Sequence, residues 1–173
     1  RRRRPHLAVH DAPGGAKSVY GRTKLAGEQA VLAAKPDSHV VRTSWVFQGA
    51  QGSDFVATMR GRAAASDGPV EVVADQIGSP TYAADLAMAL LEIADGKVDA
   101  PIVHATNAGA ASRFEQAQAT FAAVGADPQR VRPVSSDRHP RPAPRPRYTA
   151  LSATKSIEAG LPPLRSWREA LAA

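Results

Sequence analysis

Short apolar runs alternate with helix-length segments along this chain of 173 residues, and this alternation limits the folds that it can adopt. A run rich in Val and Ile between turn residues is typical of a buried strand. Apolar residues at helical spacing indicate a helix that packs along one face. Parallel strands need crossover connections, which helices usually supply. We therefore predict an α/β fold with a mainly parallel sheet.

The expected elements follow from these patterns and from capping signals. Helices are predicted at Ser18 to Ala34, Asp54 to Ala65, Thr81 to about Asp95, Ser112 to near Gly125, and from Ser166 onward. Strands are predicted at His39 to Phe47, Val70 to Ala74, Pro101 to Thr106 and Val131 to Ser135. Ser112 and Ser166 each begin a Ser-x-x-Glu capping box, and Thr81 is expected to cap its own helix. The Pro-rich stretch from His139 to Arg147 is expected to be irregular.

Composition excludes several classes of protein. The net charge is +6, but Arg1 to Arg4 supply four of these charges, so a nucleic-acid-binding surface is not expected in the remainder. Residues 1–17 form a basic segment without periodicity, and we expect them to be an irregular tail. The chain has no cysteine and no apolar run long enough to span a membrane. A cytoplasmic protein with no membrane contact is the resulting expectation.

Tyr20 and Lys24 form the most informative pair in the sequence. Residues four apart share one face of a helix. A phenol is a poor proton donor at neutral pH, but a cation beside it favours its ionised form. Such a pair can exchange a proton with an oxygen that is being reduced or oxidised. On spacing alone, however, two ordinary surface residues would give the same pattern.

The surroundings of this pair carry a family resemblance. Ser18 to Glu28 resembles the active-site helix of the extended short-chain dehydrogenase/reductases, and within them the dTDP-4-dehydrorhamnose reductase family. Four further segments in matching order are similar to that family: Val41 to Phe47, Asp75 to Thr81, Arg141 to Pro146, and Ser166 to Leu171. The resemblance therefore extends from about Ser18 to Leu171, nearly the whole chain.

The resemblance implies an enzyme that uses NADPH or NADH to reduce the 4-keto group of dTDP-4-dehydro-L-rhamnose. It implies that Tyr20 donates the proton and that Lys24 binds the nicotinamide ribose. It also implies that both residues contact the cofactor. Thr43 and Ser44 would line the nicotinamide side of the site. Trp45 would contact the sugar, although a core tryptophan is the alternative.

Two other segments allow two interpretations each. Asp75 to Thr81 is either a substrate loop or a turn followed by a helix cap. Arg141, Arg145 and Arg147 can pair with a nucleotide diphosphate, because the arginine fork matches phosphate oxygens. A solvated polyproline-like loop explains these arginines as well. Of the three, Arg145 is the predicted substrate-binding residue.

The Gly-rich turn that holds a dinucleotide pyrophosphate is not found in these residues. We therefore expect the C-terminal part of a reductase: an incomplete Rossmann-like parallel sheet with a small α/β substrate-binding region. The predicted division is a remnant of the dinucleotide-binding domain at 18–69 and a substrate-binding region at 70–173. Such a chain would be inactive by itself. The alternative is a non-catalytic nucleotide-sugar-binding or regulatory member of the same superfamily.

The sequence predicts no metal site but does predict an exposed strand edge. The five histidines are scattered, and His6 and His10 are the only pair at helical spacing, so no metal site is predicted. The strand that ends at Trp45 is apolar almost throughout, which suits a strand with neighbours on both sides. Lacking earlier strands, the sheet should expose an edge. A homo-oligomer or self-association through that edge is the expected consequence.

Overall fold

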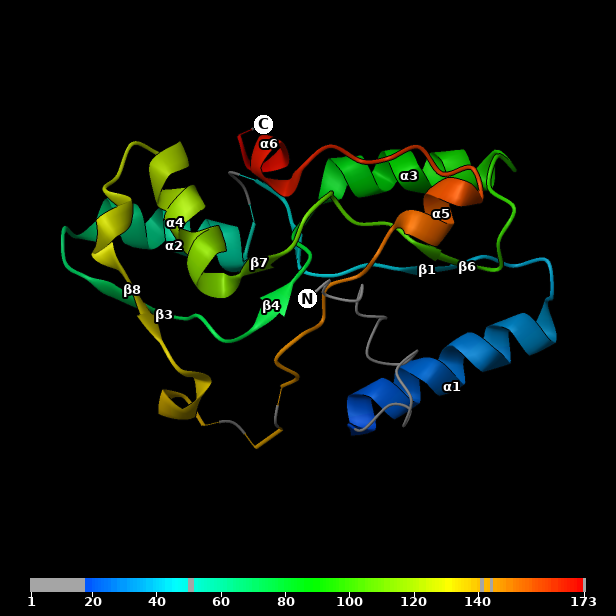
Figure 1. Ribbon diagram of the computed structural model, residues 1–173, viewed down its shortest axis with the longest axis horizontal. Coiled ribbons are helices and arrows are strands. Elements are labelled where there is room, and N and C mark those ends of the chain that lie inside the picture. Colours follow the sequence, from blue (N-terminus) through cyan, green and yellow to red (C-terminus); the bar gives the residue numbers. More distant parts are fainter. Residues whose placement is uncertain (1–17, 50–51, 141, 144, 173) are drawn as a thin grey trace, which may run out of the picture.

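Helices cover short strand pairs throughout this α/β chain, as the computed structural model of residues 18–49, 52–140, 142–143 and 145–172 shows (Figure 1). The helices are α1 (Val19–Ala34), α2 (Phe55–Ala65), α3 (Ala83–Ala94), α4 (Arg113–Ala123), α5 (Thr154–Glu158) and α6 (Trp167–Leu171). The strands are β1 (Val40–Arg42), β2 (Val46–Phe47), β3 (Val70–Val73), β4 (Ile77–Gly78), β5 (Thr81–Tyr82), β6 (Ile102–His104), β7 (Ala111–Ser112) and β8 (Val131–Val134). The tail with Arg1 to Arg4, His6 and His10 lies outside the described residues.

The strands pair mainly in parallel. β1 pairs with β6, β2 with β5, and β3 with β8, all in parallel, whereas β4 and β7 are antiparallel. Each parallel partner lies far along the chain, and one or more helices intervene. The predicted α/β class with a mainly parallel sheet is confirmed. In the described part of the chain β1 has β6 as its single strand neighbour, so its other edge is open.

The predicted strand from His39 to Phe47 is wrong in its continuity. The structure divides it into β1 and β2, with Thr43 to Trp45 between them. Trp45 has φ of 48°, a left-handed conformation that is unusual for a bulky residue. The chain therefore turns at Trp45, and β2 pairs with β5 instead of extending the β1–β6 pair.

Local capping explains where most helices begin. Ser18 Oγ accepts a hydrogen bond from Gly21 N at 3.0 Å, and the Asp54 carboxylate accepts from the first turn of α2. The capping boxes at Ser112 and Ser166 are both present, as predicted. The predicted Thr81 cap is wrong: Thr81 belongs to β5, and Tyr82 precedes α3 without a side-chain cap bond.

Three apolar clusters form the core. One lies between α2, α4, β3 and β8 around Phe121, and a second joins Phe47 and Val56 to α6 around Trp167. The third lies beneath α3 and around β6, centred on Val103 and Leu161. Buried residues from before and after position 69 form the first two clusters, and Val41 packs against the third. The division into domains at 18–69 and 70–173 stays a prediction.

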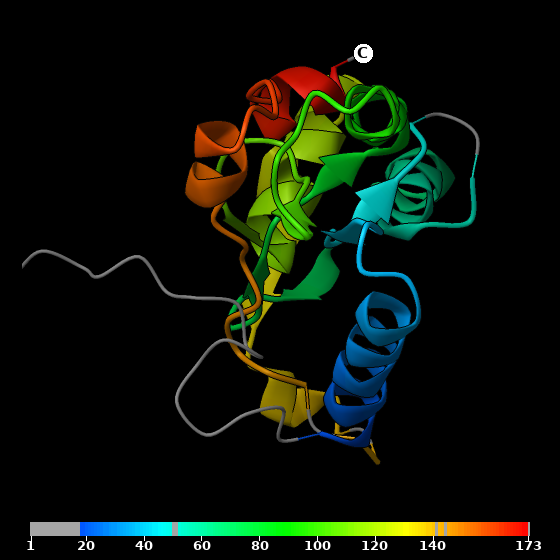
Figure 2. The same ribbon diagram turned by 90° about the vertical axis from the view of Figure 1, so that its right-hand side faces the viewer.

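Helix α1 is attached differently. None of its residues is buried, and both views show it at one end of the molecule, below the β1–β6 pair (Figures 1 and 2). Its main polar link to β1 is a bidentate ion pair in which Arg42 Nε and Nη2 donate to Glu28 at 2.9 and 2.7 Å. Arg42 is almost fully buried, so this pair lies away from bulk solvent. None of the described helices has the length and apolar character needed to cross a bilayer.

Candidate active site

Tyr20 and Lys24 lie on one exposed face of α1. Lys24 Nζ is 5.7 Å from the centroid of the Tyr20 ring, within the range of a cation–π contact. The Tyr20 side chain is 71% exposed, so its hydroxyl is free of the apolar core. This arrangement leaves the phenol and the ammonium accessible to a bound molecule. The assignment of the pair as catalytic stays a prediction.

Trp45 is the centre of a second group of residues. Gly78 packs so closely against its indole that a Cβ atom on Gly78 would lie 2.3 Å from Trp45 Cε2. The guanidinium carbon of Arg113 lies 3.7 Å from the centroid of the Trp45 ring and 4.7 Å from that of Phe55. We call Trp45, Phe55, Gly78 and Arg113 the Trp45 cluster. It brings together α2, β4, the first residue of α4 and the turn between β1 and β2.

Arg113 belongs to the Trp45 cluster, and the sequence alone did not predict it there. Burial lowers its pKa to about 10, and the charge of Arg145 acts in the same direction against a smaller opposing effect of Asp54. The available signal was its position, because a cation at the first residue of a helix opposes the helix dipole. Arg113 therefore does not stabilise the N-terminus of α4, which makes it a candidate for another role.

The segment from Asp75 to Thr81 contacts Trp45 through Gly78. Gly78 contacts the indole, while Ser79, Pro80 and Thr81 are buried. The Asp75 carboxylate accepts hydrogen bonds from Ser136 Oγ and N, and the Ser136 hydroxyl is the main cause that lowers the pKa of Asp75. At the other end, Thr81 N donates to the Trp45 carbonyl at 3.3 Å, so the segment is hydrogen-bonded at both ends.

The other predicted residues lie in the turn after β1 and in the Pro-rich stretch before Tyr148. Thr43 and Ser44 lie beside Trp45 in the turn after β1, exposed and half-buried respectively. Arg145 is exposed and near enough to Arg113 for its charge to affect that residue. Arg147 is exposed too, and its carbonyl accepts from Ile77 N at 2.8 Å. Arg141 lies outside the described residues.

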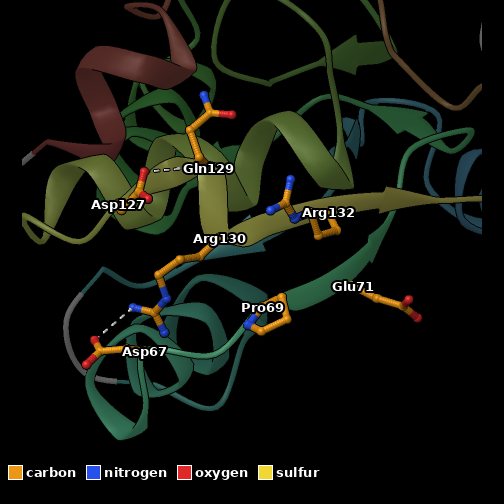
Figure 3. A pocket seen from close by; sticks show the side chains of 7 residues that line it. All are labelled: Asp67, Pro69, Glu71, Asp127, Gln129, Arg130 and Arg132. Atoms are coloured by element: carbon orange, nitrogen blue, oxygen red, sulfur yellow. Dashed lines mark hydrogen bonds and ion pairs between the residues drawn. The ribbon is translucent and has the colours of Figure 1, made fainter.

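A shallow pocket elsewhere has a structural explanation. Figure 3 shows it between the end of α2, β3 and β8, with Arg130 pointing toward Asp67. Arg130 donates to the carbonyls of Ala63, Ser66 and Gly68 and so caps the C-terminal end of α2. No predicted site residue lines this pocket. Among the residues that the structure describes, no cluster of three His, Asp or Glu can hold a metal.

Known proteins resemble this chain over nearly all of its length. The family model described as RmlD substrate binding domain matches residues 6–173. The chain belongs to the RmlD substrate binding domain family. A dTDP-4-dehydrorhamnose reductase of Mycolicibacterium smegmatis is 70% identical over 161 residues, which are 93% of this chain and 49% of that protein. One from Mycobacterium tuberculosis H37Rv is 62% identical, again with 93% of this chain and 52% of the relative covered.

Solved structures of family members agree with the fold. A dTDP-4-dehydrorhamnose reductase from Clostridium acetobutylicum superimposes with a TM-score of 0.86 at 33% identity, covering 99% of this chain and 59% of that one. A Bacillus anthracis reductase in complex with NADP gives 0.80 at 35% identity, with coverages of 92% and 54%. The chain thus spans about half the length of the curated relatives that it matches.

Proposed function

We propose that this chain carries the proton donor and the substrate contacts for NADPH-dependent reduction of the 4-keto group of dTDP-4-dehydro-L-rhamnose. The observation that carries this proposal is the exposed Tyr20–Lys24 pair, with Lys24 Nζ 5.7 Å from the Tyr20 ring. The names of the mycobacterial relatives as dTDP-4-dehydrorhamnose reductases support it. The NADP complex of the Bacillus anthracis structure supports the choice of cofactor.

In this proposal, Tyr20 gives its hydroxyl proton to the oxygen on C4 as the carbonyl is reduced. Lys24 favours the phenolate that remains, and it binds the ribose hydroxyls of the cofactor. NADPH, when bound, supplies the hydride. Tyr20 and Lys24 fit this cofactor because both are exposed and one faces the other.

The substrate contacts lie beside the turn after β1. Trp45 contacts the sugar, and Arg145 pairs with the diphosphate. Thr43 and Ser44 line the nicotinamide side. Trp45 has an unusual backbone conformation, and its side chain contacts Gly78 and Arg113. Such conformations persist where the surroundings fix them, often at functional sites.

The decisive experiment uses two forms of the protein. The purified 173-residue chain should show no measurable turnover of dTDP-4-dehydrorhamnose with NADPH. Fused behind the N-terminal half of the Mycolicibacterium smegmatis reductase, residues 18–173 should give an active enzyme. In this fusion Tyr20→Phe should lower the turnover number by about 100-fold or more, because general acid catalysis contributes on that scale.

A matched pair of lysines provides the control. Lys24→Met should greatly reduce activity of the fusion, whereas Lys97→Met should not, because Lys97 is exposed and pairs with Glu92 and Asp95 outside the Trp45 cluster. An inactive fusion that is folded and binds NADPH would contradict the proposed function. If the isolated chain turns over substrate and Tyr20→Phe abolishes that turnover, the prediction that the isolated chain is inactive is wrong.

We also infer a cytoplasmic protein that associates with itself through the open edge of β1. An unpaired strand edge attracts another strand, and β1 pairs on one side in the described residues. Sedimentation velocity over a range of concentrations tests this inference. A concentration-independent monomer would contradict it.

A further inference from the structure

Arg113 is held in place by contacts that leave much of its hydrogen-bonding capacity unused. Its guanidinium lies against the rings of Trp45 and Phe55, and Nη1 donates to Gln116 Oε1 at 3.1 Å. Gln116 is fully buried, so this acceptor is fixed. A guanidinium has five N–H donors. In the described residues, no partner is recorded for its Nε and Nη2 donors.

The charge of Arg113 is also unpaired in the described part of the chain. The nearby acidic group, Asp54, already accepts hydrogen bonds from Gln48 N, Val56 N and Ala57 N. A second cation, Arg145, lies close enough to disfavour the charge on Arg113. The repulsion between these two positive charges is unfavourable, and an anion bound beside Arg113 would reduce it.

We propose that Arg113 is a phosphate-binding residue that acts together with Arg145 on the diphosphate of the nucleotide sugar. The stack on Trp45 and the bond to Gln116 fix the guanidinium plane, and the free Nε and Nη2 form a fork that matches two phosphate oxygens. The inference rests on the proposed function, because it places the diphosphate beside the tryptophan that contacts the sugar. It adds Arg113, which was not among the residues predicted from the sequence, to the contacts of the diphosphate.

Preorganisation explains why an arginine is needed at this position. Lysine is a compact charge on a flexible stem, and it lacks the planar fork and the stacking surface. Arg113→Lys therefore keeps the charge but loses the geometry. Arg113→Gln loses the charge and keeps a hydrogen-bonding group. The two variants separate the contribution of charge from that of orientation.

The experiment measures binding of thymidine diphosphate and of inorganic pyrophosphate to the 173-residue chain by titration calorimetry. Arg113→Gln should weaken both ligands by about 10- to 100-fold, the scale of a lost hydrogen bond to a charged group. Arg113→Lys should recover part of this loss. Arg168→Gln is the control, because Arg168 stacks at 4.4 Å on Trp167, the other tryptophan. It should leave both affinities within about twofold of the wild type, since exposed charges contribute little.

Coupling between the two arginines sharpens the test. If Arg113 and Arg145 bind one diphosphate, the losses in Arg113→Gln and Arg145→Gln should not add in the double variant. Additive losses, a loss confined to thymidine diphosphate, or no saturable binding to the folded wild-type chain would each overturn the proposal. Arg113-dependent binding alongside an inactive reductase fusion would refute the proposed function and leave this site standing.

Discussion

Two of the cation–aromatic contacts in this protein, Lys24 with Tyr20 and Arg113 with Trp45, are supported very differently. Lys24 and Tyr20 are neighbours on α1. This helix has no buried residue, and the ion pair between Glu28 and Arg42 links it to β1. Arg113 and Trp45 are far apart in the sequence and meet because Gly78, Phe55 and Gln116 hold them together. The first pair follows from helical spacing alone, whereas the second requires the tertiary fold.

In the proposed site, ligand binding depends on the Trp45 cluster, whereas proton donation depends on the Tyr20–Lys24 pair. The Trp45 cluster is self-supporting within the described residues, so its geometry should survive in the isolated chain. The Tyr20–Lys24 pair lies on a helix whose attachment depends mainly on Arg42 and Glu28. Ligand affinity and catalytic competence should therefore respond to different mutations.

The largest effect is expected from Arg42→Ala. This change leaves Glu28 without the partner that it has in a largely buried ion pair, a loss on the order of 3 kcal/mol or more. Because α1 has no buried residue, we expect it to detach and unfold locally while the three cores remain. Circular dichroism should show the loss of about one helix, with little change in the midpoint of the main thermal transition.

An exposed ion pair provides the comparison for this variant. Arg165→Ala breaks the pair with Asp85, in which the arginine side chain is 39% exposed. It should leave the signal of α1 intact. Unfolding of the whole protein by Arg42→Ala would show that α1 belongs to the same cooperative unit as the cores.

Hydrogen exchange should reveal the same boundary without mutation. Among the described residues β1 and β3 each pair with one strand, but they differ in burial. Val40 and Val41 of β1 are half-buried, whereas Val70 and Val72 of β3 are buried in the core around Phe121. We expect β3 to exchange about 100-fold more slowly than β1, because local opening requires less free energy than opening the core. Strong protection of Val40 to Trp45 in a monomer would contradict this expectation.

These regions also differ in how far the sequence could predict them. The helices α1, α2 and α4 and the caps at Ser112 and Ser166 depend on residues three or four apart, and all were predicted. The break at Trp45 was missed, because the residues that contact Trp45 there, Gly78 and Arg113, are far from it in the sequence. The two-residue strands β4, β5 and β7 are too short to show a period.

The site residues likewise differ in whether the local sequence could predict them. Tyr20 and Lys24 were recognised from spacing and resemblance, and their roles stay a prediction. Arg113 was missed because nothing near it in the sequence specifies a ring partner. Thr81 was misassigned as a cap because a hydroxyl before a helix is a common signal, but here the chain continues through β5 to Tyr82.

A pair of glycine substitutions compares the two regions directly. Gly78→Ala should destabilise the protein by about 1–3 kcal/mol, because the new methyl group would overlap the Trp45 ring. Gly27→Ala on α1 meets no atom within 4 Å and should stabilise the helix by up to about 1 kcal/mol. Urea unfolding measures both changes, and Trp45 fluorescence should change in the Gly78 variant alone.

The smallest effect concerns pH and the polar network beside α3. Asn107 Nδ2 donates to Asp85 at 2.7 Å, and Arg165 donates to the same carboxylate at 2.8 and 3.0 Å. Burial acts to raise the pKa of Asp85, but the bonds from Arg165 and Asn107 outweigh it and hold this pKa below 3.8. The folded state therefore takes up this proton at lower pH than the unfolded state does.

The stability that Asp85 contributes is consequently complete above about pH 5 and is lost as the pH falls through its lowered pKa. Other carboxylates titrate in the same range, so the measurement is the difference between the wild type and Asp85→Asn. We expect that difference in unfolding free energy to shrink by up to about 1 kcal/mol between pH 6 and pH 3, since partly exposed pairs are weak. A difference that stays constant over this range would mean that the carboxylate charge adds nothing to the network, and that Asn107 and the stack of Arg165 on Tyr82 hold the segment by themselves.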